Sequence, residues 1–325
     1  MRGLIKSAWK RILIFLGFFG NKFAIFKLSN ALSSKPAPFP HRVREILDAS
    51  TPVNPIKWSP DLPAIELAIP STLKDLPYLK LVIQSAIKNS HNPIRLVRVV
   101  VPSSEIEQFR LTLGGGVEGT TLQVIDEEQL LGNLLEICNE VAPLNRRGWL
   151  IQQVLKYLCV LTSKSAGVLI MDSDTVLTTP RTWLDEDGTQ MLMISYEYHL
   201  PYQLHFLKFK MALDTSSGAP KSPRVSYVTH HQIMQPDLLR EMLGGELNWE
   251  AGLRAWISAI DFQTQSPACE YHCYGTYLAL AKTHRYKLAR WGNIAMQRSQ
   301  FQGLSLNRSR GRFGNVCSIS VHAYL

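Results

Sequence analysis

Two aspartates, Asp172 and Asp174, directly follow an uncharged segment at residues 167–171. Four of these five residues are apolar, and such a run without polar alternation predicts a strand buried on both faces of a sheet. Side chains two residues apart on an extended backbone point the same way, so both carboxylates can bind one hard cation that carries substrate phosphates. The sequence therefore predicts a metal and phosphate site at the carboxyl end of this strand, where open α/β sheets bind ligands. The competing interpretation is a polar turn.

Polar side chains on a predicted helix at residues 148–161 come shortly before this strand. Lys156 lies four residues after Gln152 and three after Gln153, so the three side chains share one helix face. If that face lines the ligand crevice, Lys156 can contact a pyrophosphate or sugar hydroxyls. If the face points outward, it is an ordinary solvated helix surface.

A histidine pair and an acid occur in the second half of the chain. His230 and His231 follow a predicted strand at residues 225–229, where they can bind an anion, transfer a proton or serve a structural role. Glu270 falls in the first turn of a predicted helix at residues 269–283. The helix dipole favours an acid at that position whatever its function.

The C-terminal region combines alternating arginines with a final apolar segment. Arg308, Arg310 and Arg312 lie in a polar stretch at residues 297–315, which is either a basic loop that folds over a diphosphate or a solvated surface loop. The segment that follows predicts a last strand, with His322 near its end.

Strands alternate with helices in the first half of the chain, which implies βαβ units and a mainly parallel sheet. Asp75 is the expected N-terminal cap of the first helix of this series. The predicted strands are residues 64–70, 94–101, 121–125, 167–171, 191–195 and 225–229. The predicted helices are residues 76–89, 104–111, 127–137, 148–161, 236–242, 249–260 and 269–283.

Composition restricts the partners and the compartment. The formal net charge of +9 favours anionic partners. The positive residues form neither a continuous basic helix nor an aromatic RNA-binding motif, so we expect no nucleic-acid partner. Five cysteines do not suit a disulfide framework and favour the cytoplasm. Cys269, His272 and Cys273 lack the fourth ligand and the second pair of a structural zinc site.

The chain divides into three predicted parts. Residues 1–32 are a basic amphipathic segment, residues 33–62 a proline-rich linker, and residues 63–325 one α/β domain. The N-terminal apolar run is far shorter than the ~20 residues of a membrane-spanning helix. Residues 1–30 can instead lie on an anionic membrane, which would make the protein peripheral on the inner face, or pack on the protein's own surface.

Taken together, the apolar strand, the Asp-x-Asp pair, the helix that begins with an acid and the histidine in the last strand resemble the GT-A glycosyltransferases. A closer resemblance, from about residue 62 to the C-terminus, is to an uncharacterised bacterial family described as glycosyltransferase-like. His272 departs from that pattern, where a second acid is expected. The motifs that carry the closer resemblance are Gly148-Trp149 with Gln152, Gln153 and Lys156, then Asp172-Ser173-Asp174-Thr175, then Thr229-His230-His231, then Glu270-Tyr271 with Tyr274-Gly275-Thr276-Tyr277.

The resemblance implies a GT-A-like, Rossmann-like fold and the transfer of a sugar from a nucleotide-diphosphate sugar to a hydroxyl of a glycan or glycolipid acceptor. It implies that Asp172, Asp174 and His322 hold Mn²⁺ or Mg²⁺. The metal would neutralise the charge on the departing nucleoside diphosphate. Lys156 and the arginines at positions 308, 310 and 312 would assist the same leaving group.

The resemblance also implies roles on the acceptor side. Glu270 would be the general base that deprotonates the acceptor hydroxyl if the reaction inverts configuration, and would position the acceptor if it retains configuration. His230, His231 and Tyr271 would contact substrate, while the amides of helix 148–161 would face the donor.

Two rival functions fit part of this pattern. In a haloacid-dehalogenase-type phosphatase, Asp172 would be the covalent nucleophile and Asp174 the acid and base. That family places its motif on an early strand and has a later Gly-Asp-x-x-x-Asp motif, which this sequence lacks. The second rival is a non-catalytic, membrane-associated protein that binds sugar nucleotides. The intact acid pair, with both Glu270 and His322, favours an enzyme over that interpretation.

Overall fold

The computed structural model describes residues 52–114, 119–195, 199–213, 226–298 and 316–322. Its centre is a five-stranded sheet in the order β3-β2-β1-β4-β7. The first four strands pair in parallel, and β7 runs antiparallel to β4. This mixed, mainly parallel sheet confirms the predicted α/β fold class. The strands are β1 (Ile65–Pro70), β2 (Ile94–Val101), β3 (Thr121–Asp126), β4 (Val168–Met171) and β7 (His231–Met234).

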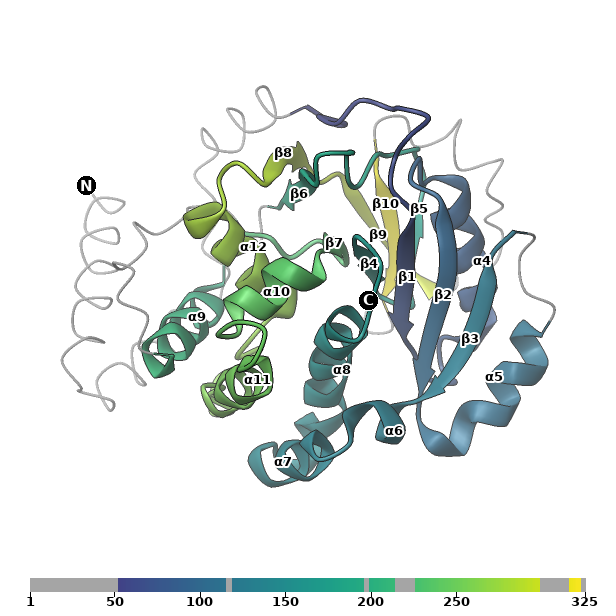
Figure 1. Cartoon of the computed structure of the whole chain (residues 1–325). Coiled ribbons are helices and arrows are strands. Elements are labelled where there is room, and N and C mark those ends of the chain that lie inside the picture. Colours follow the sequence, from purple (N-terminus) through teal and green to yellow (C-terminus); the bar gives the residue numbers. More distant parts are fainter. Residues whose placement is uncertain (1–51, 115–118, 196–198, 214–225, 299–315, 323–325) are drawn as a thin grey trace, which may run out of the picture.

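Helices cover both faces of this sheet (Figure 1). One face carries α4 (Leu76–Lys88) and α5 (Ile106–Leu113). The other face carries α8 (Leu144–Leu161), α10 (Pro236–Met242), α11 (Trp249–Ser258) and α12 (Glu270–Ala281). The other described helices are η1 (Ser103–Glu105), α6 (Glu127–Leu131), α7 (Leu134–Val141) and α9 (Leu200–Ala212).

The central strand β4 is buried on both faces, as its sequence predicts. Val168 and Ile170 belong to the apolar core on the α8 side, whereas Leu169 and Met171 belong to the core on the α4 side. Burying an apolar side chain of this size stabilises a fold by about 1.5–3 kcal/mol. These contacts hold β4 in place on both sides, and Asp172 is the first residue beyond its carboxyl end.

A second, three-stranded sheet continues the chain after the aspartates, in the order β5-β10-β9. β5 (Thr175–Leu177) pairs antiparallel with β10 (Ser318–His322), with Thr175 opposite Ser320. The backbone N–H of Val321 donates to the carbonyl of Asp174 at 2.8 Å. His322, the last residue of β10, lies opposite Gln297 of the parallel neighbour β9. The remaining strands are β9 (Asn293–Gln297), β6 (Gln190–Ile194) and β8 (Tyr286–Arg290).

The strand predicted at residues 225–229 is wrong. Over residues 226–229 the backbone makes only an isolated bridge, between Ser226 and Ser195. His230 has a φ of 56°, in the left-handed region, which interrupts an extended backbone. The chain therefore pairs with β4 only from His231 onward, opposite Met171.

The single helix predicted at residues 127–137 is also wrong, because the structure divides it into α6 and α7. Gly132 lies between the two helices with a φ of 51°. Glycine adopts this conformation without the steric cost of a side chain, so it ends α6 and lets the chain change direction.

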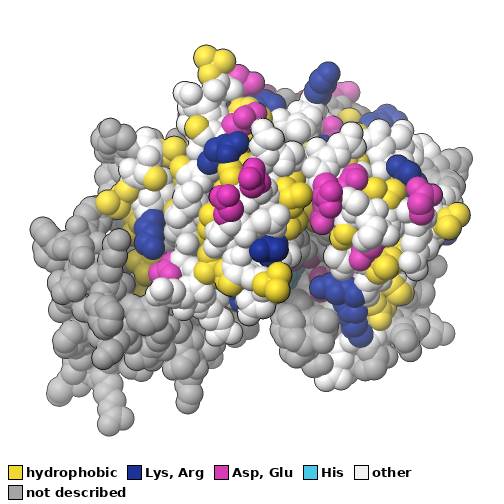
Figure 2. Space-filling model, turned by 90° about the horizontal axis from the view of Figure 1, so that it is seen from below, with side chains coloured by type: hydrophobic (Ala, Val, Ile, Leu, Met, Phe, Trp, Pro, Cys, Tyr) yellow, Lys and Arg dark blue, Asp and Glu magenta, His cyan; other side chains and the backbone are white. Residues whose placement is uncertain are grey.

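The predicted N-terminal segment and most of the predicted linker, residues 1–51, lie outside the described residues. Across the described ranges, no helix has the length and apolar character needed to cross a membrane. In Figure 2, Lys and Arg side chains are interspersed with acidic and apolar ones on the face seen from below. Because residues 1–30 lie outside the described residues, their contact with a membrane stays a prediction.

Candidate functional site

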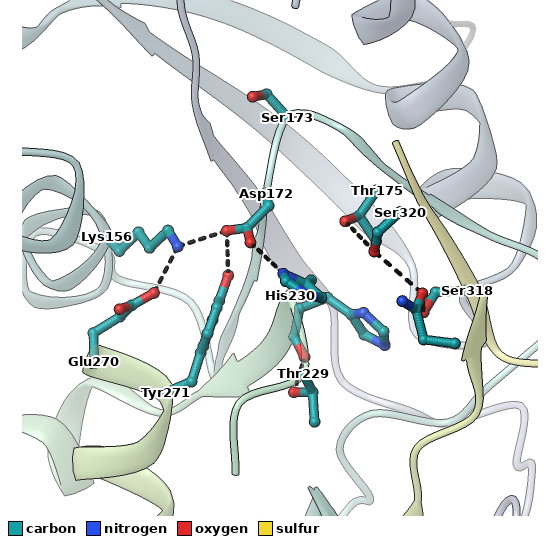
Figure 3. Close-up of polar contacts among 12 residues, drawn as sticks. Lys156, Asp172, Ser173, Thr175, Thr229, His230, Glu270, Tyr271, Ser318 and Ser320 are labelled. Carbon is teal, nitrogen blue, oxygen red and sulfur yellow. Dashed lines mark hydrogen bonds and ion pairs between the residues drawn. The ribbon is translucent and has the colours of Figure 1, made fainter. Parts of the chain in front are cut away.

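Three protein donors hold the carboxylate of Asp172 at the carboxyl end of β4 (Figure 3). Its Oδ1 accepts from Lys156 Nζ at 2.5 Å and from the Tyr271 hydroxyl at 3.0 Å. Its Oδ2 lies 2.9 Å from Nδ1 of His230. Burial alone would raise the pKa of Asp172, but the charge of Lys156 and the contact with His230 outweigh it and hold that pKa well below its usual range. Asp172 is therefore ionised and fixed in orientation.

Lys156 joins two acids from different elements. Its Nζ also lies 2.6 Å from Oε1 of Glu270, the first residue of α12, and 4.4 Å from the centre of the Tyr271 ring. Only 3% of Lys156 and 1% of Glu270 is exposed. Burial lowers the pKa of Lys156, yet the attraction of Asp172 and Glu270 outweighs burial and raises it. Lys156 therefore faces the site as a buried cation, and the solvated-face interpretation does not hold.

Glu270 lies in the site but is fully buried. Burial raises its pKa, and the neighbouring ammonium of Lys156 opposes that rise. Its predicted role as a general base stays a prediction, as do the predicted roles of the two amides on α8. Gln153 is 6% exposed and Gln152 is half-buried.

The two histidines at residues 230 and 231 occupy different environments. His230 contacts Asp172, and its ring centre lies 5.5 Å from that of Trp291. His231 is fully buried with its ring edge-on to Trp183 at 5.7 Å, and neither ring nitrogen has a partner among the described residues. Burial lowers the pKa of His231 to about 3, so its ring is neutral. His230 thus belongs to the site, and His231 packs in the core on the α4 side.

Asp174 has the electrostatic environment of a cation ligand. Burial and the negative charges of Asp172 and Asp75 together raise its pKa to about 6, although His230 opposes part of that shift. A divalent cation would offset this mutual repulsion. A carboxylate offers about four lone-pair positions, and Asp172 uses three of them on protein donors. A cation bound here would therefore be held mainly through Asp174, because three protein donors already engage Asp172.

No group of three His, Cys, Asp or Glu side chains suited to a metal ion occurs in the described part of the chain. That part excludes the side chain of His322, whose backbone in β10 is described. The predicted metal set of Asp172, Asp174 and His322 therefore stays a prediction.

A family of unknown function, DUF6492, matches residues 63–305. The chain belongs to the DUF6492 family. No curated protein matches it.

Solved structures match this DUF6492 member at low identity. The apo form of mouse xyloside xylosyltransferase 1 matches with a TM-score of 0.46 and 11% identity, covering 80% of this chain and 98% of that one. An active-site mutant of LgtC matches with a TM-score of 0.39 and 12% identity, over 79% of this chain and 87% of that one. The galactosyltransferase LgtC with donor and acceptor sugar analogues gives a TM-score of 0.35 and 14% identity over the same shares.

Arg308, Arg310 and Arg312 lie outside the described residues, so their contact with a diphosphate stays a prediction.

Tyr271 was predicted to contact substrate, whereas its hydroxyl donates to Asp172 and only 2% of the residue is exposed. Trp291, which packs against His230, was not predicted, because nothing in the sequence separates it from an ordinary buried tryptophan.

Proposed function

We propose that this protein is a metal-dependent glycosyltransferase that moves a sugar from a nucleotide-diphosphate sugar to a hydroxyl of a glycan or glycolipid acceptor. The observation that carries the proposal is the pairing of β5 with β10, in which Thr175 lies opposite Ser320 and the backbone N–H of Val321 donates to the carbonyl of Asp174 at 2.8 Å. His322 is the residue that follows Val321, which supports a role for this histidine together with Asp174. The order of the motifs supports the substrate class.

Asp174, with Asp172 and His322, would hold Mn²⁺ or Mg²⁺, and the bound ion would neutralise charge on the departing diphosphate. Lys156, Tyr271 and His230 keep Asp172 ionised and correctly oriented. This preorganisation means that the site need not rearrange when charge develops on the leaving group. The arginines at 308, 310 and 312 would add positive charge on the same side.

Glu270 would accept the proton of the acceptor hydroxyl if the enzyme inverts configuration. Burial raises the pKa of this carboxylate, which makes it a stronger base, while Lys156 at 2.6 Å holds its orientation. If the enzyme retains configuration, Glu270 would position the acceptor. For a glycolipid acceptor, residues 1–30 would place the protein on the inner face of the membrane.

The test is a thermal-shift screen of nucleoside diphosphates and nucleotide sugars with and without Mn²⁺. A ligand that binds only the folded protein raises its melting temperature by mass action. We expect at least one of these ligands to raise it only when Mn²⁺ is present. Asp174→Asn, which removes the main proposed metal ligand and keeps the side-chain shape, should abolish the metal-dependent shift.

The matched control is Asp261→Asn, because this acid lies after α11 and 42% of its side chain is exposed. It should keep the full shift. Equal stabilisation of the wild-type protein with and without Mn²⁺ would contradict the proposed metal site.

A further inference from the structure

Asp75 occupies the N-cap position of α4 but does not cap the helix. The sequence predicts a cap here, and the structure shows no hydrogen bond from the Asp75 side chain to the first turn. Asp126 provides the contrast, because at the start of α6 its Oδ1 accepts from the backbone N–H of Glu128 at 2.8 Å. The predicted capping role of Asp75 is therefore wrong, and its carboxylate, in a residue only 4% exposed, is used elsewhere.

The Asp75 carboxylate instead joins the turn that carries the two aspartates. Its Oδ2 accepts from the Ser173 hydroxyl at 2.7 Å. Ser173 is 3% exposed and follows Asp172 in a turn closed by the N–H of Thr175, which donates to the Asp172 carbonyl at 3.1 Å. Figure 3 shows the Ser173 side chain pointing away from the carboxylate of Asp172. The middle residue of the Asp-x-Asp sequence is thus anchored on the side away from the Asp172 carboxylate.

The other oxygen of Asp75 holds the end of a third segment. Its Oδ1 pairs with the guanidinium of Arg298, which also donates from Nη1 to the carbonyl of Lys74 at 3.0 Å. Arg298 directly follows β9, and the last residue of β9, Gln297, pairs with His322 of β10. One buried carboxylate therefore links the β1–α4 loop to the Asp-x-Asp turn and to the strand beside His322.

We propose that Asp75 is a positioning residue that fixes the Asp172–Asp174 turn through Ser173 and aligns it with the β9–β10 pair through Arg298. The role rests on the proposed function, since it concerns the placement of the same metal ligands. The contacts with Ser173 and Arg298 engage one oxygen each and so hold the Asp75 carboxylate between the two segments. Removing a group that orients a metal ligand commonly lowers metal affinity by about 10- to 100-fold.

The experiment measures Mn²⁺ affinity of the full chain by electron paramagnetic resonance, with Mn²⁺ alone as the probe. We expect Asp75→Ala and Ser173→Ala each to weaken Mn²⁺ binding by about tenfold or more. The double variant should be little weaker than Asp75→Ala, because both changes break the same contact. Ser173→Ala leaves the charge of Asp75 in place, so its effect reports the lost hydrogen bond and not a lost negative charge. Ser173→Thr, which keeps the hydroxyl, should restore part of the affinity.

A control at another helix start separates positioning from general damage. Asp126→Ala removes a true helix cap, so it should lower the melting temperature and leave Mn²⁺ affinity unchanged. Wild-type Mn²⁺ affinity in Ser173→Ala and Asp75→Ala would overturn the role of Asp75 and leave the proposed function standing. Failure of the wild-type protein to bind Mn²⁺ would overturn the proposed function, and the role of Asp75 with it.

Discussion

At the scale of single residues, the proposed role of Glu270 as a general base can be tested by one conservative substitution. Its Oε1 accepts from Lys156 Nζ at 2.6 Å. In Glu270→Gln the amide oxygen can still accept this hydrogen bond, and Lys156 keeps Asp172 as its counter-ion, so we expect the fold and Mn²⁺-dependent donor binding to survive. The amide cannot take up a proton at neutral pH. Turnover of the nucleotide sugar identified by thermal shift should therefore fall by about 10²-fold or more.

Tyr271→Phe is the matched comparison, because Tyr271 is the next residue of α12 and touches the same cluster. It removes one donor to Asp172 and no proton acceptor, so we expect weaker Mn²⁺ binding and substantial remaining turnover. Unchanged turnover in Glu270→Gln would exclude Glu270 as the base.

The sequence could predict the acids of the site but not how they are held. Asp172 follows an apolar strand and Glu270 opens a helix, and both signals are local. The contact of Ser173 with Asp75 spans 98 residues of sequence, and no local pattern reports it. The burial of Glu270 was likewise missed, because it depends on the packing of α12 against α8.

At the scale of elements, the placement of α12 depends on its close approach to residues 226–229. A Cβ added at Gly275 would lie 2.4 Å from Cγ and 2.6 Å from Cβ of Tyr227. Tyr227 is itself only 2% exposed, so its side chain cannot move aside. Gly275→Ala should therefore displace the helix that carries Glu270 and Tyr271, and lower the free energy of unfolding by roughly 2 kcal/mol or more in urea titrations.

Gly148 provides the opposite case within a helix. It is exposed in α8, and a Cβ added there meets nothing within 4 Å. Gly148→Ala should raise the free energy of unfolding by roughly 1 kcal/mol, since alanine favours the helix. A loss of stability there, or no loss in Gly275→Ala, would show that the packing of these helices differs from that described.

The sequence predicts where an element begins and ends when its hydrophobic periodicity and the residues that interrupt it are adjacent in the chain. The helix predicted at residues 76–89 corresponds to α4, and the strand at residues 94–101 to β2. The predicted strand at residues 225–229 failed because its residues have the composition of a strand while the backbone turns at His230. The pairing of β5 with β10 could not be predicted either, because it joins segments that are 145 residues apart at Thr175 and Ser320.

At the scale of the whole molecule, buried neutral histidines make folding stability depend on pH. His205 of α9 is 3% exposed, and its Nε2 lies 2.9 Å from the backbone oxygen of Trp256 in α11. Burial lowers the pKa of His205 to about 4, although the bond to Trp256 opposes part of that shift. The contact joins two helices of the domain, so protonation of this ring acts on the stability of the folded state as a whole.

The sign of this effect follows from the two pKa values. An unfolded chain has a histidine pKa of about 6.5, so it binds a proton before the folded protein does as the pH falls. The stability due to neutral His205 is therefore complete above about pH 6.5 and is lost as the pH falls towards about 4. Between about pH 7.5 and about pH 5 this single group should cost about 2 kcal/mol of unfolding free energy.

Other groups titrate in the same range, so the decisive quantity is a difference between two proteins. In His205→Gln the amide Nε2 can still donate to Trp256, and the side chain has no titration in this range. Urea unfolding at both pH values should show that wild type loses more stability on acidification than the variant does, by about 2 kcal/mol. Equal losses in the two proteins would mean that His205 takes up a proton in the folded state, and that the core between α9 and α11 admits water.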